Sequence, residues 1–238
     1  RFIIMSMRKG ILRMASLLAA IFVTATLNAQ PWTPAGPDDG NQPLVYNNNS
    51  VGLSMASDRG KGFYIMYREY VWSSPTAVEQ RASVRRWNGT TWSAIGAPGF
   101  SAGTVDYMHI AVAPGPVPYV IYQDHTIGQA AVVKTFNGTS WVSVGSPVSS
   151  ARALHCRIAT DNTGAPVVAY VDDAIAPNIV AVKRWNGTSW QAIGTNIALT
   201  SNIQDLRLAI GSTGLPQVLI QHSVAGVPSA EAFRYTGT

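Results

Sequence analysis

Short runs of alternating or wholly apolar residues recur along the chain after residue 30, separated by glycine, proline and asparagine. Runs of this length between turn residues predict β-strands, because helices need longer segments with a period of 3.6 residues. Residues 167–171 are apolar at every position, which is typical of a strand covered on both faces. Helical periodicity is nearly absent outside the N-terminal region. The pattern therefore predicts an all-β protein.

The predicted strands belong to a sequence repeat with a period of about 49 residues. The first motif, Asn-Gly-Thr-x-Trp after an aromatic residue, occurs at residues 87–92, 136–141 and 185–190, and each copy is followed by a glycine, Gly96, Gly145 or Gly194. The second motif, Gly-x-Pro followed by an apolar run, occurs at 164–170 and 214–220, with a variant at 116–122. An Asn-Gly pair between strands predicts a hairpin with a type I′ turn. Each repeat is thus expected to form four antiparallel strands.

A repeat of this length and strand content is the size of one β-propeller blade. A β-solenoid would have shorter coils, and a β-sandwich would not repeat its sequence. We therefore predict a β-propeller over residues 30–238, with four visible repeats at about 32–91, 92–140, 141–189 and 190–238. The motif tryptophans Trp92, Trp141 and Trp190 are expected to pack between blades, although they could instead stack on sugar rings.

The two motifs can be compared with the repeats of known propeller families. It has neither the Gly-Gly doublet of kelch blades nor the Trp-Asp pair of WD40 blades. The order Gly-x-Pro-x-Val-x-Tyr, then Asn-Gly-Thr-x-Trp and glycine, resembles the tandem propeller repeats of exported bacterial proteins, and it is more distantly similar to bacterial propeller lectins. The resemblance extends over about residues 32–238. It implies the fold much more specifically than an activity.

The first repeat differs from the others. Residues 32–36 have the Trp-x-x-x-Gly spacing of the last strand of a blade, so the chain would open with a fourth strand and close with a third, which is how propellers close their ring. The interval from Trp32 to Trp92 is longer than the later ones and predicts an insertion of 11 residues near 70–80. The chain begins with Arg1 and stops inside a repeat motif. We therefore expect an incomplete propeller.

Residues 7–29 have the pattern of a secretory signal peptide, with an upstream extension at 1–6. Arg8, Lys9 and Arg13 give a positive start, residues 14–25 are apolar, and small residues lead to Ala29, after which we expect cleavage. A membrane anchor is the alternative, but an apolar run of about a dozen residues is short of the roughly 20 that span a bilayer. The sequence predicts a secreted or cell-surface protein that does not span the membrane after signal removal.

Charge and cysteine content narrow the function. The formal net charge is +5, but four of the 17 basic residues and none of the acidic ones precede residue 30, so the remainder carries only +1. Nucleic acid is therefore not an expected partner. The lone Cys156 excludes a disulfide framework and is expected to be a buried small hydrophobe. The histidines lack metal-ligand spacing, and no cofactor motif is present, so we expect neither metal nor cofactor.

Ionisable residues occur at one equivalent position in all four repeats. Glu69, Asp124, Asp172 and His222 each lie two residues beyond the end of the Gly-x-Pro motif, and equivalent positions in a propeller share one face. They could bind sugar hydroxyls, or they could simply cap strand ends in exposed loops. Trp72, inside the predicted insertion, is the candidate for an exposed aromatic contact.

Three functions remain open. The favoured one is an exported, non-catalytic module that binds glycans or cell-surface polymers through these five residues. The second is a structural or protein-interaction propeller that uses the insertion at 70–80 as its contact. The third is a hydrolase or lyase whose carboxylates at the propeller mouth act as a pair, as in glycosidases.

Overall fold

The computed structural model describes residues 52–58, 60, 62–176 and 179–237. Every regular element in this part is a β-strand except the short 3-10 turn η1 (His125–Ile127). The strands are β1 (Ser54–Ser57), β2 (Phe63–Ser74), β3 (Ala77–Trp87), β4 (Trp92–Ala94), β5 (Val105–Ala113), β6 (Val117–Asp124), β7 (Ala130–Phe136), β8 (Trp141–Ser143), β9 (Ala153–Thr160), β10 (Pro166–Asp172), β11 (Ile179–Trp185), β12 (Trp190–Ala192), β13 (Ile197–Ala198), β14 (Ile203–Ile210), β15 (Pro216–Val224) and β16 (Val227–Arg234). The predicted all-β class is confirmed.

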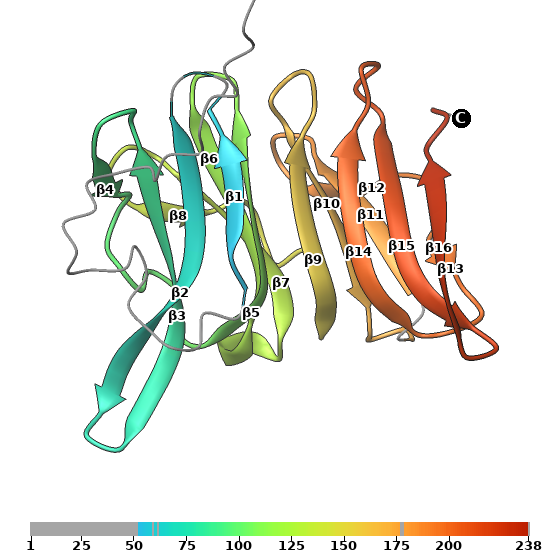
Figure 1. The fold of residues 1–238 in the computed structure, drawn as a ribbon, viewed down its shortest axis with the longest axis horizontal. Coiled ribbons are helices and arrows are strands. Elements are labelled where there is room, and N and C mark those ends of the chain that lie inside the picture. The colour runs from blue at the N-terminus through green and yellow to red at the C-terminus, as the bar shows by residue number, and fades with distance from the viewer. Residues whose placement is uncertain (1–51, 59, 61, 177–178, 238) are drawn as a thin grey trace, which may run out of the picture. The chain divides into compact units, whose positions relative to one another are not determined.

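The strands form four antiparallel sheets, which we call blades A to D. Blade A has the order β1-β2-β3-β4, blade B β5-β6-β7-β8, and blade C β9-β10-β11-β12 with the short β13 added beside β11. Blade D contains the described strands β14-β15-β16. The blades follow one another side by side in chain order, and the first strand of each lies next to the first strand of its neighbour (Figure 1). Consecutive up-and-down sheets packed in this way are β-propeller blades, as the repeat predicted.

The hydrophobic core lies between neighbouring blades. Alternate residues of one strand point to opposite faces of its sheet. In β10, Val168 and Tyr170 therefore pack against blade B, whereas Val167, Ala169 and Val171 pack against blade D. All five are buried. This two-sided burial explains why the run is apolar at every position.

Two of the three motif tryptophans, Trp141 and Trp190, bond their blade to the preceding one, whereas Trp92 packs on Phe63 and Trp87 of its own blade. The indole Nε1 of Trp141 in blade B donates to the Ile95 carbonyl oxygen of blade A at 2.8 Å, and Trp190 in blade C donates to Val144 of blade B at 2.9 Å. A side chain at Gly145 would collide with the ring of Trp185 in the next blade. The predicted packing between blades is therefore confirmed for Trp141 and Trp190.

The Asn-Gly turns differ from the predicted type I′ form. Trp87 pairs with Trp92, so the loop between β3 and β4 has four residues, and Asn88 does not have a positive φ. The Asn88 side chain instead accepts from the amides of Thr90 and Thr91 at 2.9 and 2.8 Å. The loops at Asn137 and Asn186 repeat this bonding. A side-chain carbonyl that satisfies two amides favours the longer loop.

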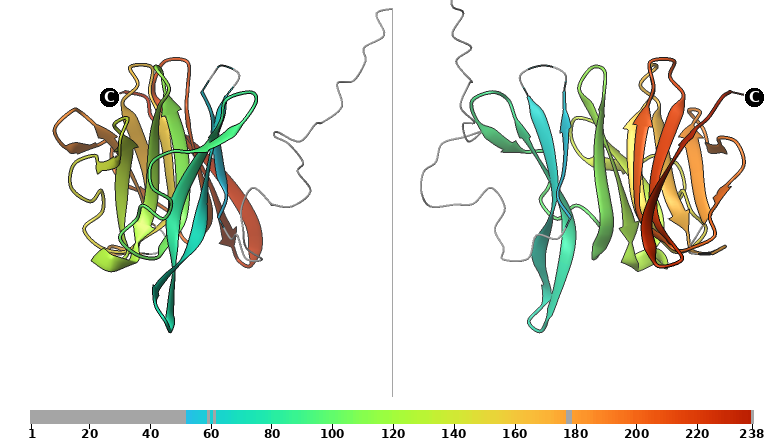
Figure 2. Two further views of the ribbon diagram at one scale, coloured as in Figure 1. Left: turned by 90° about the vertical axis from the view of Figure 1, so that its left-hand side faces the viewer. Right: turned by 45° about the vertical axis from the view of Figure 1, so that its right-hand side comes forward.

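The extra residues of the first repeat lengthen one hairpin. Strands β2 and β3 continue to Ser74 and Ala77, and their tip extends beyond the other blades (Figures 1 and 2). The predicted signal peptide at 1–29 and the predicted strand at 32–36 lie outside the described residues. Among the described residues, no helix offers the length and apolar surface that crossing a bilayer requires.

Candidate functional site

Of the four ionisable residues at the repeated position, Glu69, Asp124 and His222 have side-chain contacts within their own blades. Glu69 accepts from the hydroxyl of buried Ser83 at 2.5 Å. Asp124, 6% exposed, caps η1 by accepting from the amide and hydroxyl of Thr126 at 2.9 and 2.6 Å. Both carboxylates therefore hold local structure.

Asp172 is half-buried and His222 is fully buried. The main-chain carbonyl oxygen of Asp172 accepts the amides that close the turn after β10, whereas its side-chain Oδ1 is buried without a hydrogen-bond partner among the described residues. His222 is 1% exposed; its Nδ1 lies 3.0 Å from the Ser201 hydroxyl and its Nε2 lies 2.9 Å from Glu231. In the described part of the chain, no hydrogen bond or ion pair joins any two of the four predicted residues. The four residues therefore do not contact one another, and their role in binding stays a prediction.

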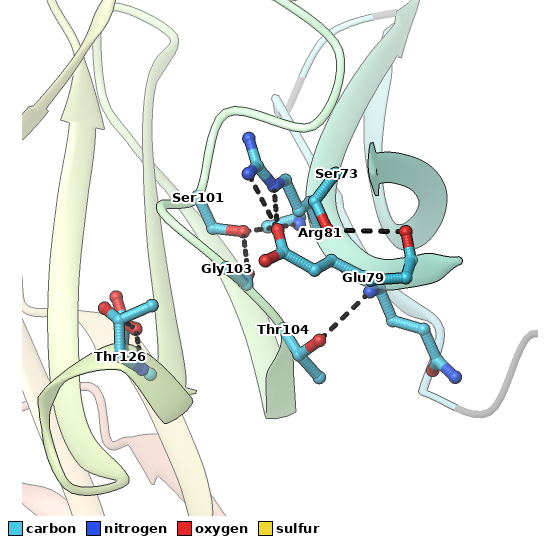
Figure 3. A network of polar contacts seen from close by, with 11 residues as sticks. Ser73, Glu79, Arg81, Ser101, Gly103, Thr104 and Thr126 are labelled. Atoms are coloured by element: carbon cyan, nitrogen blue, oxygen red, sulfur yellow. Dashed lines mark hydrogen bonds and ion pairs between the residues drawn. The ribbon is translucent and has the colours of Figure 1, made fainter. Parts of the chain in front are cut away.

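Trp72 lies where an exposed contact was expected. Its side chain is 70% exposed on the long β2–β3 hairpin, opposite Val78 in the ladder. The foot of this hairpin is fixed by polar contacts (Figure 3). Glu79 pairs with Arg81 at 2.7 Å, and the Thr104 hydroxyl accepts from the amide of Gln80 at 3.2 Å. The hairpin thus presents one large apolar side chain from an anchored base.

A pocket lies instead among the first strands of the four blades. It has a volume of about 650 Å³. Its walls come from residues 52–55 in and before β1, Arg68 of β2, residues 106–109 of β5, Arg157 of β9 and Arg207 of β14. None of the five predicted site residues lines it. Every described blade contributes at least one side chain.

Four of the residues that line the pocket occupy the same position in successive repeats. Ser54, His109, Arg157 and Arg207 each lie thirteen residues before the end of the apolar run in their own blade, at Tyr67, Tyr122, Tyr170 or Ile220. Their ladder partners are likewise equivalent: Met66, Ile121, Ala169 and Leu219. Because equivalent positions in a propeller face the same region, all four residues line the same pocket.

The first strands are irregular at this pocket. Tyr107 and His155 have positive φ values of 47° and 50°, and the strand ladders of β5 and β9 shift register beside them. Their rings lie in contact, with centroids 5.0 Å apart. β-Bulges redirect side chains, and left-handed backbone at residues other than glycine is strained and clusters at binding sites.

Two carboxylates form ion pairs with the arginines that line the pocket. Asp106 accepts from Arg68 at 2.7 Å and contacts His125 Nε2 at 2.9 Å. Asp205 pairs with Arg157 at 2.8 Å and also with Arg207. Burial opposes ionisation of Asp205, but the Leu206 amide and the two guanidinium groups lower its pKa below the ordinary value. Asp205 therefore stays charged and holds both arginines.

The histidines at the pocket are neutral near pH 7. Burial, reinforced by the positive charge of Arg157, lowers the pKa of His109 to about 4. The same two causes lower the pKa of His155. Cys156, by contrast, is the buried small hydrophobe that the sequence predicted: it is fully buried, and burial raises its thiol pKa to about 12. Among the described residues, no three histidine, cysteine or acidic side chains gather as a metal site requires.

Comparison with known proteins establishes the fold alone. No protein-family model and no curated protein matches the chain. A solved protein of unknown function from Dyadobacter fermentans is 11% identical with a TM-score of 0.54, covering 82% of this chain and 64% of its own. The Hadza microbial sialidase Hz136 (11% identity, TM-score 0.48, 76% of this chain and 43% of its own) and the fucose-specific lectin of Aleuria aurantia (14%, 0.48, 77% and 59%) are less similar in fold. This chain spans less than two thirds of the length of each.

Proposed function

We propose that the chain is an exported, non-catalytic binding module that recognises carbohydrate in the pocket formed by the first strands. One observation carries the proposal: the repeat-equivalent Ser54, His109, Arg157 and Arg207 converge on a space of about 650 Å³. That volume lies within the usual range for small-molecule sites. Export is inferred from the leader at residues 1–29, whose composition matches a signal peptide.

The chemistry of the lining suits a sugar. Sugar rings present hydroxyl groups around an apolar face, so their sites combine planar polar side chains with an aromatic platform. Arg207 supplies a planar donor and Arg157 a fixed positive charge, and His109 and Ser54 add a neutral imidazole and a hydroxyl. Tyr107, 37% exposed, supplies the aromatic ring.

The same lining supports binding over hydrolysis. Glycoside hydrolysis generally uses two carboxylates on either side of the scissile bond. Among the described residues that line the pocket, Asp106 is the one carboxylate, and Arg68 and His125 already contact both of its oxygens. An acid paired in this way is a structural support rather than a proton donor.

A second candidate, contact with a protein through the β2–β3 hairpin, rests on a separate observation. Trp72 and its ladder partner Val78 are 70% and 40% exposed. Adjacent exposed apolar side chains on a projecting element are typical of interaction sites. This contact would use a surface distinct from the pocket.

The test is binding of the purified chain to an array of polysaccharides, followed by calorimetry on those it retains. Arg207→Gln removes a pocket arginine whose side chain is 59% exposed; Arg152→Gln is the matched control, because Arg152 is 55% exposed and also pairs with one aspartate, Asp173. We expect Arg207→Gln to weaken binding about tenfold and Arg152→Gln to leave it unchanged. Loss of binding with Trp72→Ser but not with Arg207→Gln would move the site to the hairpin. Retention of no polysaccharide by the folded protein would refute the proposal.

A further inference from the structure

Tyr107 and His155 are equivalent residues of two neighbouring blades. Each begins a β-bulge, in which two residues of the first strand lie opposite one motif tyrosine, Tyr122 or Tyr170. The second residue of the blade B bulge, Met108, is buried in the core, whereas Tyr107 is 37% exposed and lines the pocket. The bulge therefore turns the Tyr107 side chain away from the core and toward the pocket.

The left-handed backbone of these two residues is not required by the blade. Tyr107 and His155 have φ values of 47° and 50°. The equivalent residue of blade A is Gly52, whose φ is 101°, and that of blade D is Asp205, whose φ is not positive. Glycine adopts this conformation freely, whereas a side chain costs energy there, less for histidine than for tyrosine. Blade B therefore carries a tyrosine at a place where glycine would be unstrained.

Polar contacts of the two side chains do not offset the strain. Blades B and C are each flanked on both sides by described blades. Within the described residues, neither the Tyr107 nor the His155 side chain has a hydrogen bond or an ion pair. Their rings contact each other across the blade boundary, with centroids 5.0 Å apart and planes inclined by 54°. The half-buried His155 thus supports the Tyr107 ring that lines the pocket.

From this geometry we infer that Tyr107 is a ligand-contacting residue kept at the expense of stability, and that His155 is the positioning residue that sets the angle of its ring. Strained residues persist where the side chain serves binding. The inference rests on the proposed function and adds two properties to the pocket. A glycine at residue 107 would relieve strain but lose affinity for the sugar, and a ring at residue 155 is needed for full affinity.

Two substitutions of Tyr107 separate strain from ligand contact. Tyr107→Gly and Tyr107→Ala both remove the ring, but only glycine relieves the strain, so Tyr107→Gly should unfold at a midpoint about 2 to 4 °C above that of Tyr107→Ala. Calorimetry of the full chain with cellohexaose, xylohexaose and mannohexaose measures binding. We expect at least one of these sugars to bind the unsubstituted chain and to bind both variants about tenfold more weakly. Tyr107→Phe, which keeps the ring, should retain most of the affinity.

Gln129 provides the matched control. It lies in the same blade, has a φ of 63° and does not line the pocket. Gln129→Gly relieves strain relative to Gln129→Ala, and neither variant should change binding. His155→Ala should weaken binding because the Tyr107 ring loses its support, and His155→Phe, which restores a ring, should recover it.

The outcomes separate the inference from the proposed function. Unchanged binding by Tyr107→Gly, where Arg207→Gln weakens binding, would overturn the inference and retain the carbohydrate site. Equal unfolding midpoints of Tyr107→Gly and Tyr107→Ala would show that no stability is given up at this residue. Failure of His155→Phe to recover binding would overturn the positioning role.

Two further outcomes bear on the whole inference. Equal losses of binding in Gln129→Gly and Tyr107→Gly would reveal a general effect on the fold and overturn it. Absence of binding to every sugar tested, including the polysaccharide array, would overturn both proposals.

Discussion

His109 and Arg157 occupy the same register position in neighbouring blades. His109 pairs with Ile121 and Arg157 with Ala169, in each case the residue directly before the motif tyrosine. The Nδ1 of His109 lies 3.3 Å from the Ile158 amide nitrogen, so the residue also bonds to the main chain of the next blade. The position therefore both joins the blades and lines the pocket.

Burial of His109 makes stability depend on pH. Its pKa is about 4 in the folded protein and about 6.5 when unfolded, so below pH 6.5 the unfolded state binds more protons. The stability contributed by the neutral imidazole is complete above pH 6.5 and is lost as the pH falls toward 4. At pH 5 the loss should reach about 2 kcal/mol.

Urea unfolding at pH 7 and pH 5 measures this loss. The variant His109→Gln has no imidazole at this position, so its free energy of unfolding should fall less between the two pH values, by about 2 kcal/mol. His155, which titrates in the same direction, is retained in both proteins and cancels in the comparison. Equal falls in the two proteins would show that His109 is not buried as a neutral group.

The glycine after each motif tryptophan should be sensitive to substitution. Gly145 has a φ of +72° and lies against the ring of Trp185, whereas Gly138 has a φ of +99° and no neighbouring atom at the place of a side chain. Gly138→Ala should cost about 1 to 2 kcal/mol through backbone strain alone. Gly145→Ala should cost about 3 to 5 kcal/mol, because a collision is added to the strain. Similar midpoints in thermal unfolding of the two variants would contradict the packing of Trp185 on this glycine.

The hydrogen bond between blades B and C can be tested separately. Trp190→Phe retains an aromatic ring but removes the donor to the Val144 carbonyl oxygen. We expect a loss of about 1 kcal/mol, which chemical denaturation resolves. An unchanged free energy of unfolding would mean that the bond contributes nothing in solution.

Asp124 should prove structural. Asp124→Ala removes the cap of η1 and should lower stability by about 1 kcal/mol. Glycan affinity should not change, because Asp124 does not line the pocket. A loss of affinity in a variant of normal stability would restore the ligand-binding role that its place in the repeat first indicated.

The fold was predictable from sequence because its causes are local and repeated. The two-sided burial of β10 and the blade joints at Trp141 and Trp190 follow from apolar periodicity and motif spacing. The turn type was predicted wrongly. The Asn88 side chain accepts from the amides of Thr90 and Thr91, and this bonding stabilises a four-residue loop instead of a two-residue turn.

The pocket was not predicted from the sequence. The position two residues after the motif tyrosine holds acidic groups in three blades. Glu69 and Asp124 accept from neighbouring hydroxyls or amides, and none of the three lines the pocket. The repeat position that lines the pocket is occupied by three different residue types in the four blades: Ser54, His109, Arg157 and Arg207. The one sequence pattern that could have indicated this position is the arginine shared by the last two repeats, Arg157 and Arg207. The bulges at Tyr107 and His155 that redirect the neighbouring side chains have no motif of their own.

A crystal structure of the chain with a bound oligosaccharide would locate the ligand directly. We expect sugar density in the pocket, with sugar oxygens within hydrogen-bond distance of its polar side chains and a ring beside Tyr107. Density against Trp72 on the β2–β3 hairpin, with the pocket filled only by solvent, would contradict it.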